Sequence, residues 1–363
     1  MTHMDFRTER IFKGPGFAET LFLGACGGTR IIRKASNPDA FPFSRTALAR
    51  EIRLLLSLPE ELRRCFPPVL HTNLGDQPED SPELPACIFY DMPYYSPEDG
   101  WVTLSKHILE GGMNAGEARR VLGEIVDTAF RYFRLDERAP AADYAEKTML
   151  TAMRESIAWA ESEKDFFPLL TVENLVINGR PAPCIMELSE LFQNTTRLRA
   201  ILTPYRERFL HGDFFPENIL FNHLTGRWIL LDPVSVRGVH RGDFILDLNK
   251  MGDWLSGELP ALRMGQFSVN LRGNRASLII HSHSGDLENL HRLQLSDWYY
   301  ERMADSAYAP LFAEERGWER RWIFIKAFYS FCMVPLADKT QAVARYLLAL
   351  KSMAEFIEKT DGR

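Results

Sequence analysis

Four polar residues lie close together with the types and spacing that phosphoryl transfer requires. The segment "FLHGDFFPENILF" (209–221) holds His211, Asp213 and Asn218, and the nearby "WILLDP" (228–233) ends with Asp232. Phosphoryl transfer needs a carboxylate that orients the attacking hydroxyl, and metal ions that neutralise phosphate charge. Asp213 and Asn218 have the spacing of the base and the metal-binding asparagine in the pattern H-R-D-x-x-x-x-N. Asp232 would add a carboxylate, a ligand that Mg²⁺ prefers.

A simpler interpretation is that these residues only form turns, because Asp, Pro and Asn are common there. Short motifs also occur by chance. The flanking sequence decides between the two interpretations. The apolar segments "ILF" (219–221) and "WILL" (228–231), separated by "NHLTG" (222–226), predict a hairpin that brings Asp232 beside the loop. This context favours a catalytic loop.

Three successive segments, "LHGDFFPENILF", "LLDPVSVRG" and "RGDFILDLNKM", resemble signatures of the aminoglycoside phosphotransferase and choline kinase-like superfamily. Its members are small-molecule kinases with the protein-kinase-like fold, and the strong resemblance covers residues 209–251. It implies these roles: a catalytic loop with His211, the catalytic base Asp213, and the Mg²⁺ ligands Asn218 and Asp232. Asp243 and Asp247 match the segment GD-x-x-x-D, which braces the loop. From the residues alone, they could be a helix N-cap and a helix-surface charge.

The N-terminal region is expected to bind the nucleotide. "KGPGFAE" (13–19), with Gly14 and Gly16, could cover the phosphates with backbone N–H groups. A lysine paired with a helix glutamate should contact phosphate oxygens, and Glu51 is the predicted glutamate. Lys34 and Arg33 compete for the basic role, because adjacent strand residues point to opposite faces. Lys34 fits by chemistry, whereas Arg33 directly follows two isoleucines, where some relatives carry the basic residue.

The segment "FYDMPYY" (89–95) is predicted to be the hinge that holds the nucleotide base. Asp91 and Met92 would offer backbone groups to the base. Tyr90 would lie behind the base, where its ring could favour GTP over ATP.

The elements predict an α+β chain with two lobes, and the resemblance implies the bilobal protein-kinase-like fold. Residues 1–94 read as strands with one helix at 44–58, the hinge lies at about 90–97, and residues 98–363 read as mainly helical. These ranges are predicted to be a nucleotide-binding lobe and a lobe with the catalytic loop, metal site and acceptor pocket. Asn178-Gly179 predicts a hairpin within residues 174–188.

Composition narrows the possible partners and locations. The chain has 363 residues, 45% of them hydrophobic, and a net charge of −6, which disfavours a nucleic-acid partner. The short basic group "ERRW" (319–322) reads as part of a solvated helix face. Five scattered cysteines and the lack of an apolar leader or membrane-length apolar run predict a cytoplasmic protein without a membrane partner.

The expected activity is transfer of the γ-phosphoryl group of ATP to a small-molecule hydroxyl, with Mg²⁺ as the metal ion. GTP is the alternative phosphoryl donor. The acceptor could be an aminoglycoside, a nucleoside-type antibiotic, a sugar or a related alcohol, and Asp253, Glu258 and Asp297 could line its pocket. Gly212 replaces the arginine of H-R-D, which disfavours a protein kinase. The alternative is a catalytically silent, kinase-like nucleotide-binding regulator.

Overall fold

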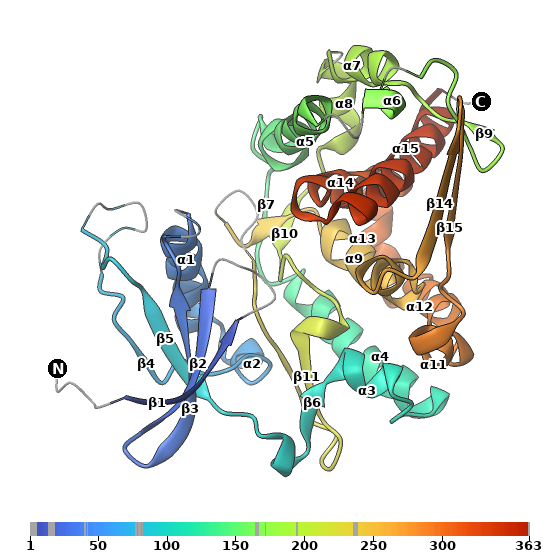
Figure 1. Ribbon diagram of the computed structural model, residues 1–363. Coiled ribbons are helices and arrows are strands. Elements are labelled where there is room, and N and C mark those ends of the chain that lie inside the picture. Colours follow the sequence, from blue (N-terminus) through green and yellow to red (C-terminus); the bar gives the residue numbers. More distant parts are fainter. Residues whose placement is uncertain are drawn as a thin grey trace. The chain divides into compact units, whose positions relative to one another are not determined.

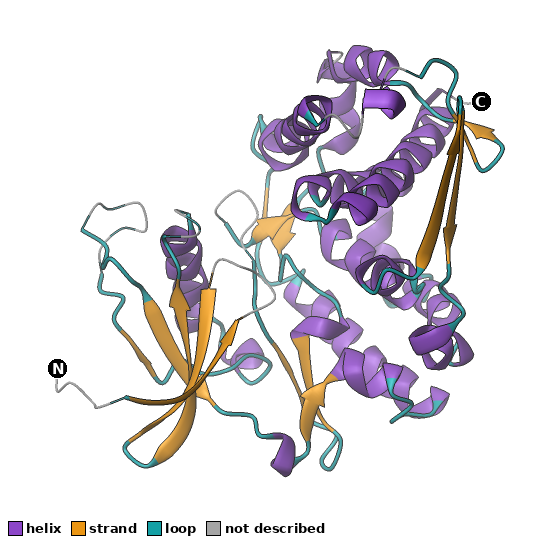
Figure 2. Ribbon diagram, viewed as in Figure 1, coloured by secondary structure: helices purple, strands orange, loops and turns teal. Residues whose placement is uncertain are grey.

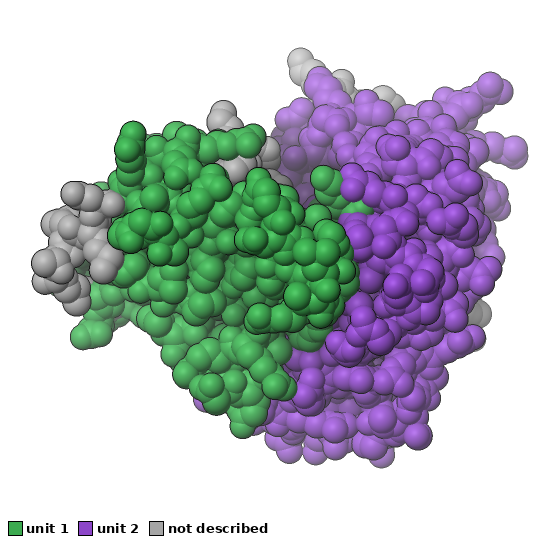
Figure 3. All heavy atoms as spheres, turned by 90° about the horizontal axis from the view of Figure 1, so that it is seen from below, with its two compact units in different colours: residues 1–106, 211–240 green, residues 107–210, 241–363 purple. Residues whose placement is uncertain are grey.

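The chain divides into two compact units, coloured separately in Figure 3. We describe them from a computed structural model that covers residues 6–13, 19–39, 41, 43–76, 78, 81, 83–163, 167–170, 172–193, 195–234 and 239–361. Unit 1 comprises residues 1–106 and 211–240, and unit 2 comprises residues 107–210 and 241–363. Unit 1 is therefore discontinuous in sequence, because the segment that carries the catalytic motif joins the N-terminal residues.

Unit 1 contains most of the strands (Figures 1 and 2). Its elements are β1 (Arg7–Lys13), β2 (Glu19–Cys26), β3 (Thr29–Ser36), α1 (Ser44–Ser57), α2 (Glu60–Arg63), β4 (His71–Thr72), β5 (Phe89–Pro93), η1 (Pro97–Asp99), β6 (Trp101–Thr103), η3 (Pro216–Asn218), β11 (Ile219–Asn222) and β12 (Trp228–Leu230). One antiparallel sheet has the order β1-β2-β3-β5-β4, and a second has the order β12-β11-β6. The helix α3 (Leu104–Leu109) begins in this unit and ends in unit 2.

Helix α1 packs one face into the core of unit 1. Leu48, Ile52 and Leu55 are buried and follow helical spacing, so they lie on the same side of the helix. Glu51 lies three residues after Leu48 and four before Leu55, which places its carboxylate on this buried face as well. A carboxylate in such a place needs a partner, since burying an unpaired charge is costly.

Unit 2 is mainly helical. Its elements are α4 (Ala115–Tyr132), β7 (Glu137–Arg138), the π-helix η2 (Glu146–Leu150), α5 (Thr151–Ser162), α6 (Phe167–Leu170), β8 (Val176–Ile177), β9 (Arg180–Pro181), α7 (Ile185–Gln193), α8 (Thr195–Leu202), β10 (Glu207–Phe209), β13 (Arg241–Gly242), α9 (Ile245–Leu255), α10 (Glu258–Arg263), β14 (Phe267–Arg272), β15 (Arg275–Ile280), η4 (Gly285–Leu287), α11 (Glu288–Arg292), α12 (Leu295–Met303), α13 (Ala309–Glu314), α14 (Trp318–Cys332), η5 (Val334–Leu336) and α15 (Lys339–Asp361). Helix α14 packs against both α15 and α9 (Figure 1). Two small sheets have the orders β13-β10-β7 and β14-β15-β8-β9.

The predicted α+β class with a strand-rich N-terminal region and a helical C-terminal region is confirmed (Figure 2). The hairpin at Asn178-Gly179 is present, but it is shorter than predicted, because β8 and β9 have only two residues each. Residues 185–193 instead form helix α7, whose apolar residues follow helical periodicity. No helix in the described ranges has the length and apolar character needed to cross a membrane.

Candidate active site

The loop between β10 and β11 holds Asp213 and Asn218 against each other. The Asn218 Nδ2 donates to the Asp213 carboxylate oxygen Oδ2 at 2.6 Å and to the Asp213 carbonyl oxygen at 3.0 Å. Pro216 begins the short helix η3, which ends at Asn218 and turns the chain into β11. The amide nitrogen of Asn218 thus fixes the Asp213 side chain, and its amide oxygen is the atom suited to a metal ion.

The β11–β12 hairpin brings the two predicted metal ligands to the same end of the sheet. Ile219 pairs with Leu230, and the Leu231 N–H donates to the Asn218 carbonyl at 2.8 Å. Asp232 follows directly with a positive φ of 57°, a backbone conformation that aspartate tolerates better than most residues. The predicted hairpin is confirmed, and it places Asp232 beside the loop despite the intervening sequence.

Gly212 allows the chain after Asp232 to lie against the catalytic loop. The Val234 N–H donates to the His211 carbonyl at 2.7 Å. Gly212 has a φ of +83°, and a Cβ atom there would lie 1.9 Å from the Val234 carbonyl oxygen. An arginine, as in the protein-kinase pattern, does not fit this position.

His211 occupies the interior of unit 1 and supports the loop. Its ring is fully buried and stacks near Phe66, with ring centroids 5.9 Å apart. Its Nδ1 accepts a hydrogen bond from the Asp213 N–H at 3.3 Å. These contacts suit a residue that positions Asp213.

Lys34 links the N-terminal sheet to the catalytic segment. Its Nζ lies 2.7 Å from Glu51 Oε2 and 2.5 Å from Asp232 Oδ1. Lys34 and Glu51 are almost completely buried, whereas the Asp232 side chain is 44% exposed. The three residues come from β3, α1 and the end of the β11–β12 hairpin, so three parts of unit 1 meet at one ammonium group.

Electrostatics within this cluster stabilise charged Lys34. Burial alone would lower the pKa of Lys34, but Asp232 and Glu51 raise it well above the ordinary value. The attraction of Lys34 holds the pKa of Asp232 below its usual value despite desolvation. Burial raises the pKa of Glu51 to about 7, although Lys34 opposes this shift. The Tyr90 hydroxyl also donates a hydrogen bond to Glu51 Oε1, at 2.8 Å, which fixes the Tyr90 side chain beside Glu51.

Arg33 lies on the other face of β3, as strand alternation predicted. Its guanidinium makes two bonds to the Asp91 carboxylate, at 2.7 and 3.0 Å, and packs between the rings of Phe6 and Phe89. The Asp91 carboxylate is buried, so Arg33 provides the charge that it needs inside the protein. Only Lys34 of the two basic residues contacts Glu51 and Asp232 among the described residues.

The predicted hinge residues belong to a paired strand. Asp91 and Met92 lie in β5, opposite Arg33 and Ile32 of β3. The Asp91 carbonyl accepts from the Leu70 N–H at 2.8 Å, so this oxygen already has a donor. Their contact with a nucleotide base stays a prediction. Gly14 and Gly16 of the predicted phosphate loop lie outside the described residues.

Asp243 and Asp247 are both buried in unit 2, which corrects the interpretation of Asp247 as a helix-surface charge. Asp247 accepts a hydrogen bond from the buried hydroxyl of Tyr132 at 3.1 Å. The N-cap of α9 is Phe244 rather than Asp243, but the Asp243 carboxylate still accepts from the N–H of Ile245, the first residue of the helix, at 3.1 Å.

Sequence reasoning missed the main partner of Asp243, which is Arg321. Its Nε lies 2.6 Å from Asp243 Oδ2, and its Nη2 lies 2.7 Å from Glu315 Oε2. Arg321 belongs to "ERRW", which we interpreted as solvated, but its side chain is 2% exposed. The aromatic residues around the basic pair were the available signal, since they indicate a helix with two buried faces.

Two of the three acids proposed for the acceptor pocket are already paired. Lys326 of α14 contacts both Asp253 of α9 and Glu258 of α10. Asp297 lies exposed on α12. Because Lys326 already neutralises part of their charge, Asp253 and Glu258 are less available to a cationic acceptor than the sequence suggested.

Comparison with known proteins gives a family match and distant structural likenesses. The model of the phosphotransferase enzyme family (APH) matches residues 18–278. A GDP complex of aminoglycoside 2′-phosphotransferase-IIIa is 13% identical, with coverage of 97% of this chain and 94% of that one and a TM-score of 0.49. A thermostable mutant of aminoglycoside phosphotransferase APH(4)-Ia with ADP and hygromycin B is 12% identical, with coverage of 96% and 95% and a TM-score of 0.48. A microcompartment-associated aminopropanol kinase is 11% identical, with coverage of 99% and 93% and a TM-score of 0.43.

No curated protein matches the sequence. The family match spans well over half of the chain and includes the three segments within residues 209–251 that carry the resemblance. It confirms the resemblance to small-molecule kinases that the sequence suggested. The chain belongs to the phosphotransferase enzyme family.

Proposed function

We propose that this protein transfers the γ-phosphoryl group of ATP or GTP to a hydroxyl group of a small molecule, with Mg²⁺ as the metal. The observation that carries the proposal is the position of Lys34 Nζ, 2.5 Å from Asp232 and 2.7 Å from Glu51. A loop that served only as a turn would have no use for a buried ammonium group against its carboxylate. A phosphotransferase does, because a lysine fixed by a helix glutamate can contact phosphate oxygens.

Asp213 is the residue proposed to orient the acceptor hydroxyl. Its carboxylate is fixed by Asn218 and its N–H by His211, so it is held in one place before a substrate arrives. A fixed carboxylate within reach of a hydroxyl is suited to general-base catalysis.

The residues present fit a magnesium ion. Asn218 and Asp232 would hold it through side-chain oxygens, and Mg²⁺, when bound, supplies positive charge that stabilises the transferring phosphoryl group. The described residues contain no group of three or more His, Cys, Asp or Glu arranged for one metal, which agrees with an ion that keeps water and phosphate oxygens as ligands. Lys34 would then exchange its bond to Asp232 for a phosphate oxygen and keep Glu51.

A small-molecule acceptor fits better than a protein. Protein kinases use the arginine of H-R-D to respond to phosphorylation of an activation loop, and Gly212 has no room for any side chain.

Turnover of ATP and GTP against a panel of aminoglycosides, nucleoside-type antibiotics, sugars and other alcohols tests the proposal. Product should form only with Mg²⁺ and should carry a new phosphate monoester. Nucleotide binding without phosphorylation of any hydroxyl, and without hydrolysis, would support the silent regulator instead.

A further inference from the structure

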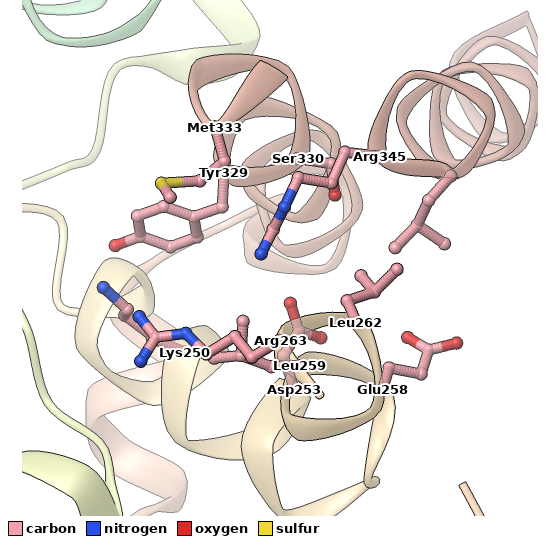
Figure 4. Close-up of a pocket in the computed structure, with 11 residues that line it drawn as sticks. Lys250, Asp253, Glu258, Leu259, Leu262, Arg263, Tyr329, Ser330, Met333 and Arg345 are labelled. Atoms are coloured by element: carbon pink, nitrogen blue, oxygen red, sulfur yellow. The ribbon is translucent and has the colours of Figure 1, made fainter. Parts of the chain in front are cut away.

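A small cavity in unit 2 gathers positive charge, and none of the residues proposed for catalysis or metal binding lines it. It has a volume of about 60 Å³ and lies among α9, α10, α14 and α15. Lys250, Arg263 and Arg345 line it, together with Asp253 and Glu258. Figure 4 shows Arg345 extending from α15 into the cavity, opposite Lys250 of α9 and Arg263 of α10.

Arg345 is the residue that most needs an explanation. It is only 4% exposed, and its buried Nε has no hydrogen-bond partner in the described part of the chain. Burying an unsatisfied charged donor is costly, so native proteins usually give such a group a partner. Burial and repulsion from Arg263 lower the pKa of Arg345 to about 10, against the attraction of Asp338.

The cavity combines three basic residues with two acids. Asp253 and Glu258 face Lys326, which lies 3.7 Å from Asp253 and closer to Glu258. Lys326 offsets part of the charge of these two acids, and Asp338 attracts Arg345. The gathering of Lys250, Arg263 and Arg345 at one cavity suits an anionic ligand.

The size of the cavity also limits its ligand. A water molecule needs roughly 10–15 Å³ of such space, so 60 Å³ accommodates a group of a few heavy atoms but not a nucleotide. Arginine binds phosphate through paired N–H donors, and burial strengthens these charge-assisted bonds.

We propose that the cavity among α9, α10, α14 and α15 binds a phosphate group, with Arg345, Arg263 and Lys250 as its ligands. The phosphate is either free in solution or part of a larger small molecule that reaches the cavity. Binding of inorganic phosphate needs no turnover, so its failure is separable from failure of the phosphotransfer activity.

The test titrates inorganic phosphate into the full-length protein by calorimetry and follows the melting temperature in parallel. Arg345→Met should weaken phosphate binding by roughly ten- to a hundredfold, the value of one hydrogen bond to a charged group. The same variant should melt no lower than the parent without phosphate, because it removes a buried charged group whose Nε has no hydrogen-bond partner in the described part of the chain. A purely structural arginine would show the opposite pattern, with a lower melting temperature.

Two further variants keep the test decisive. Arg263→Gln changes an exposed lining residue, so it should fold normally and still weaken phosphate binding. Arg272→Gln, an exposed arginine on β14, is the matched control and should bind like the parent. Absence of phosphate binding by the parent, or equal binding by Arg345→Met and the control, would overturn the proposal.

Proton uptake gives an independent readout. Burial, together with repulsion from Arg263 and Arg345, lowers the pKa of Lys250 to about 7, although Asp253 opposes this shift. The Lys250 Nζ also lies 5.4 Å from the centroid of the Tyr329 ring. A bound dianion favours the charged lysine and raises that pKa. Calorimetry near pH 8 in buffers of different ionisation enthalpy should therefore detect uptake of a proton with phosphate, and release of a proton would contradict this arrangement.

Kinetics separate the two sources of the phosphate group. If the group belongs to the acceptor, inorganic phosphate should compete with the acceptor and raise its KM. If free phosphate is the ligand, it should bind without competing. Either result is consistent with a phosphate site, and it identifies whether the bound phosphate group is free or belongs to the acceptor.

Discussion

Asn218 holds the Asp213 carboxylate and His211 holds the Asp213 N–H, and these two contacts make replacement of Asp213 informative. Asp213→Asn keeps the size of the side chain but removes the charge that would accept the hydroxyl proton. We expect kcat to fall by roughly 10²–10⁴-fold, the usual contribution of a general base, with little change in nucleotide affinity. Steady-state kinetics with a phosphorylated acceptor would measure this.

The control for Asp213 is an acid away from the loop. Asp286 lies exposed in η4, and Asp286→Asn should leave kcat unchanged. If Asp213→Asn retained the parent's turnover, the residue would have no part in the chemistry.

Lys34 and Arg33 are adjacent in sequence, yet their side chains have different partners. Lys34→Met should raise the KM for nucleotide strongly, because the Lys34 ammonium lies between Glu51 and Asp232, where we propose that it contacts a phosphate oxygen. Arg33→Met should leave that KM nearly unchanged and lower the melting temperature instead, because the buried Asp91 carboxylate loses its guanidinium partner and keeps His71 Nδ1 at 3.5 Å. The inverse pattern would assign phosphate contact to Arg33.

At the scale of elements, the close contact between the catalytic loop and the segment after β12 depends on Gly212. Gly212→Ala should destabilise the protein by more than the ~1–2 kcal/mol cost of a left-handed alanine, because its Cβ would also collide with the Val234 carbonyl. It should lower kcat as well, since the collision displaces the loop between His211 and Asp213. Urea unfolding and kinetics would measure the two effects.

Gly273 offers a matched control for this substitution. It also has a positive φ, of +58°, but nothing lies within 4 Å of the position of its Cβ. Gly273→Ala therefore carries the backbone strain without the collision, and we expect a smaller loss of stability and normal turnover. Equal losses in the two variants would show that the contact with Val234 has no importance.

The sequence predicted the elements whose signals are local. The hairpin at 219–230 and the helix α1 follow directly from apolar periodicity and turn residues, and strand alternation separated Arg33 from Lys34. The partner of Arg321 could not be predicted in the same way, because Asp243 lies 78 residues earlier. Long-range pairing buries Arg321 against Asp243, whereas the adjacent Arg320 is exposed.

At the scale of the whole molecule, the two compact units do not follow a single cut in the sequence. The predicted ranges 1–94 and 98–363 rest on a local change in composition, and the assignment of functions to them stays a prediction. Unit 1 instead extends to residue 106 and includes residues 211–240. The pairing of β11 with β6 explains this, since Leu220 lies opposite Thr103 and Phe221 opposite Val102. No local sequence pattern predicts that β11 pairs with a strand more than 100 residues earlier, because Leu220 and its partner Thr103 are that far apart.

Because Lys34, Glu51, Asn218 and Asp232 all belong to unit 1, nucleotide and metal should stabilise the protein together. A ligand that binds only the folded state at 100 times its Kd contributes ~2.7 kcal/mol. ATP·Mg²⁺ should thus raise the melting temperature of the parent clearly. Asp232→Ala should lose this rise and its turnover, because the metal loses its anchoring carboxylate and the phosphates face the remaining acids unscreened.

Nucleotide without metal is the control that isolates Asp232. In the presence of a chelator, ATP should stabilise the parent and Asp232→Ala weakly and to a similar extent, because Lys34 keeps Glu51 as its partner in both. Asp232→Ala should therefore differ from the parent only when Mg²⁺ is present. A fully active Asp232→Ala enzyme, or an equal rise in melting temperature with ATP·Mg²⁺, would remove Asp232 from the metal site and reduce residues 211–218 to a turn.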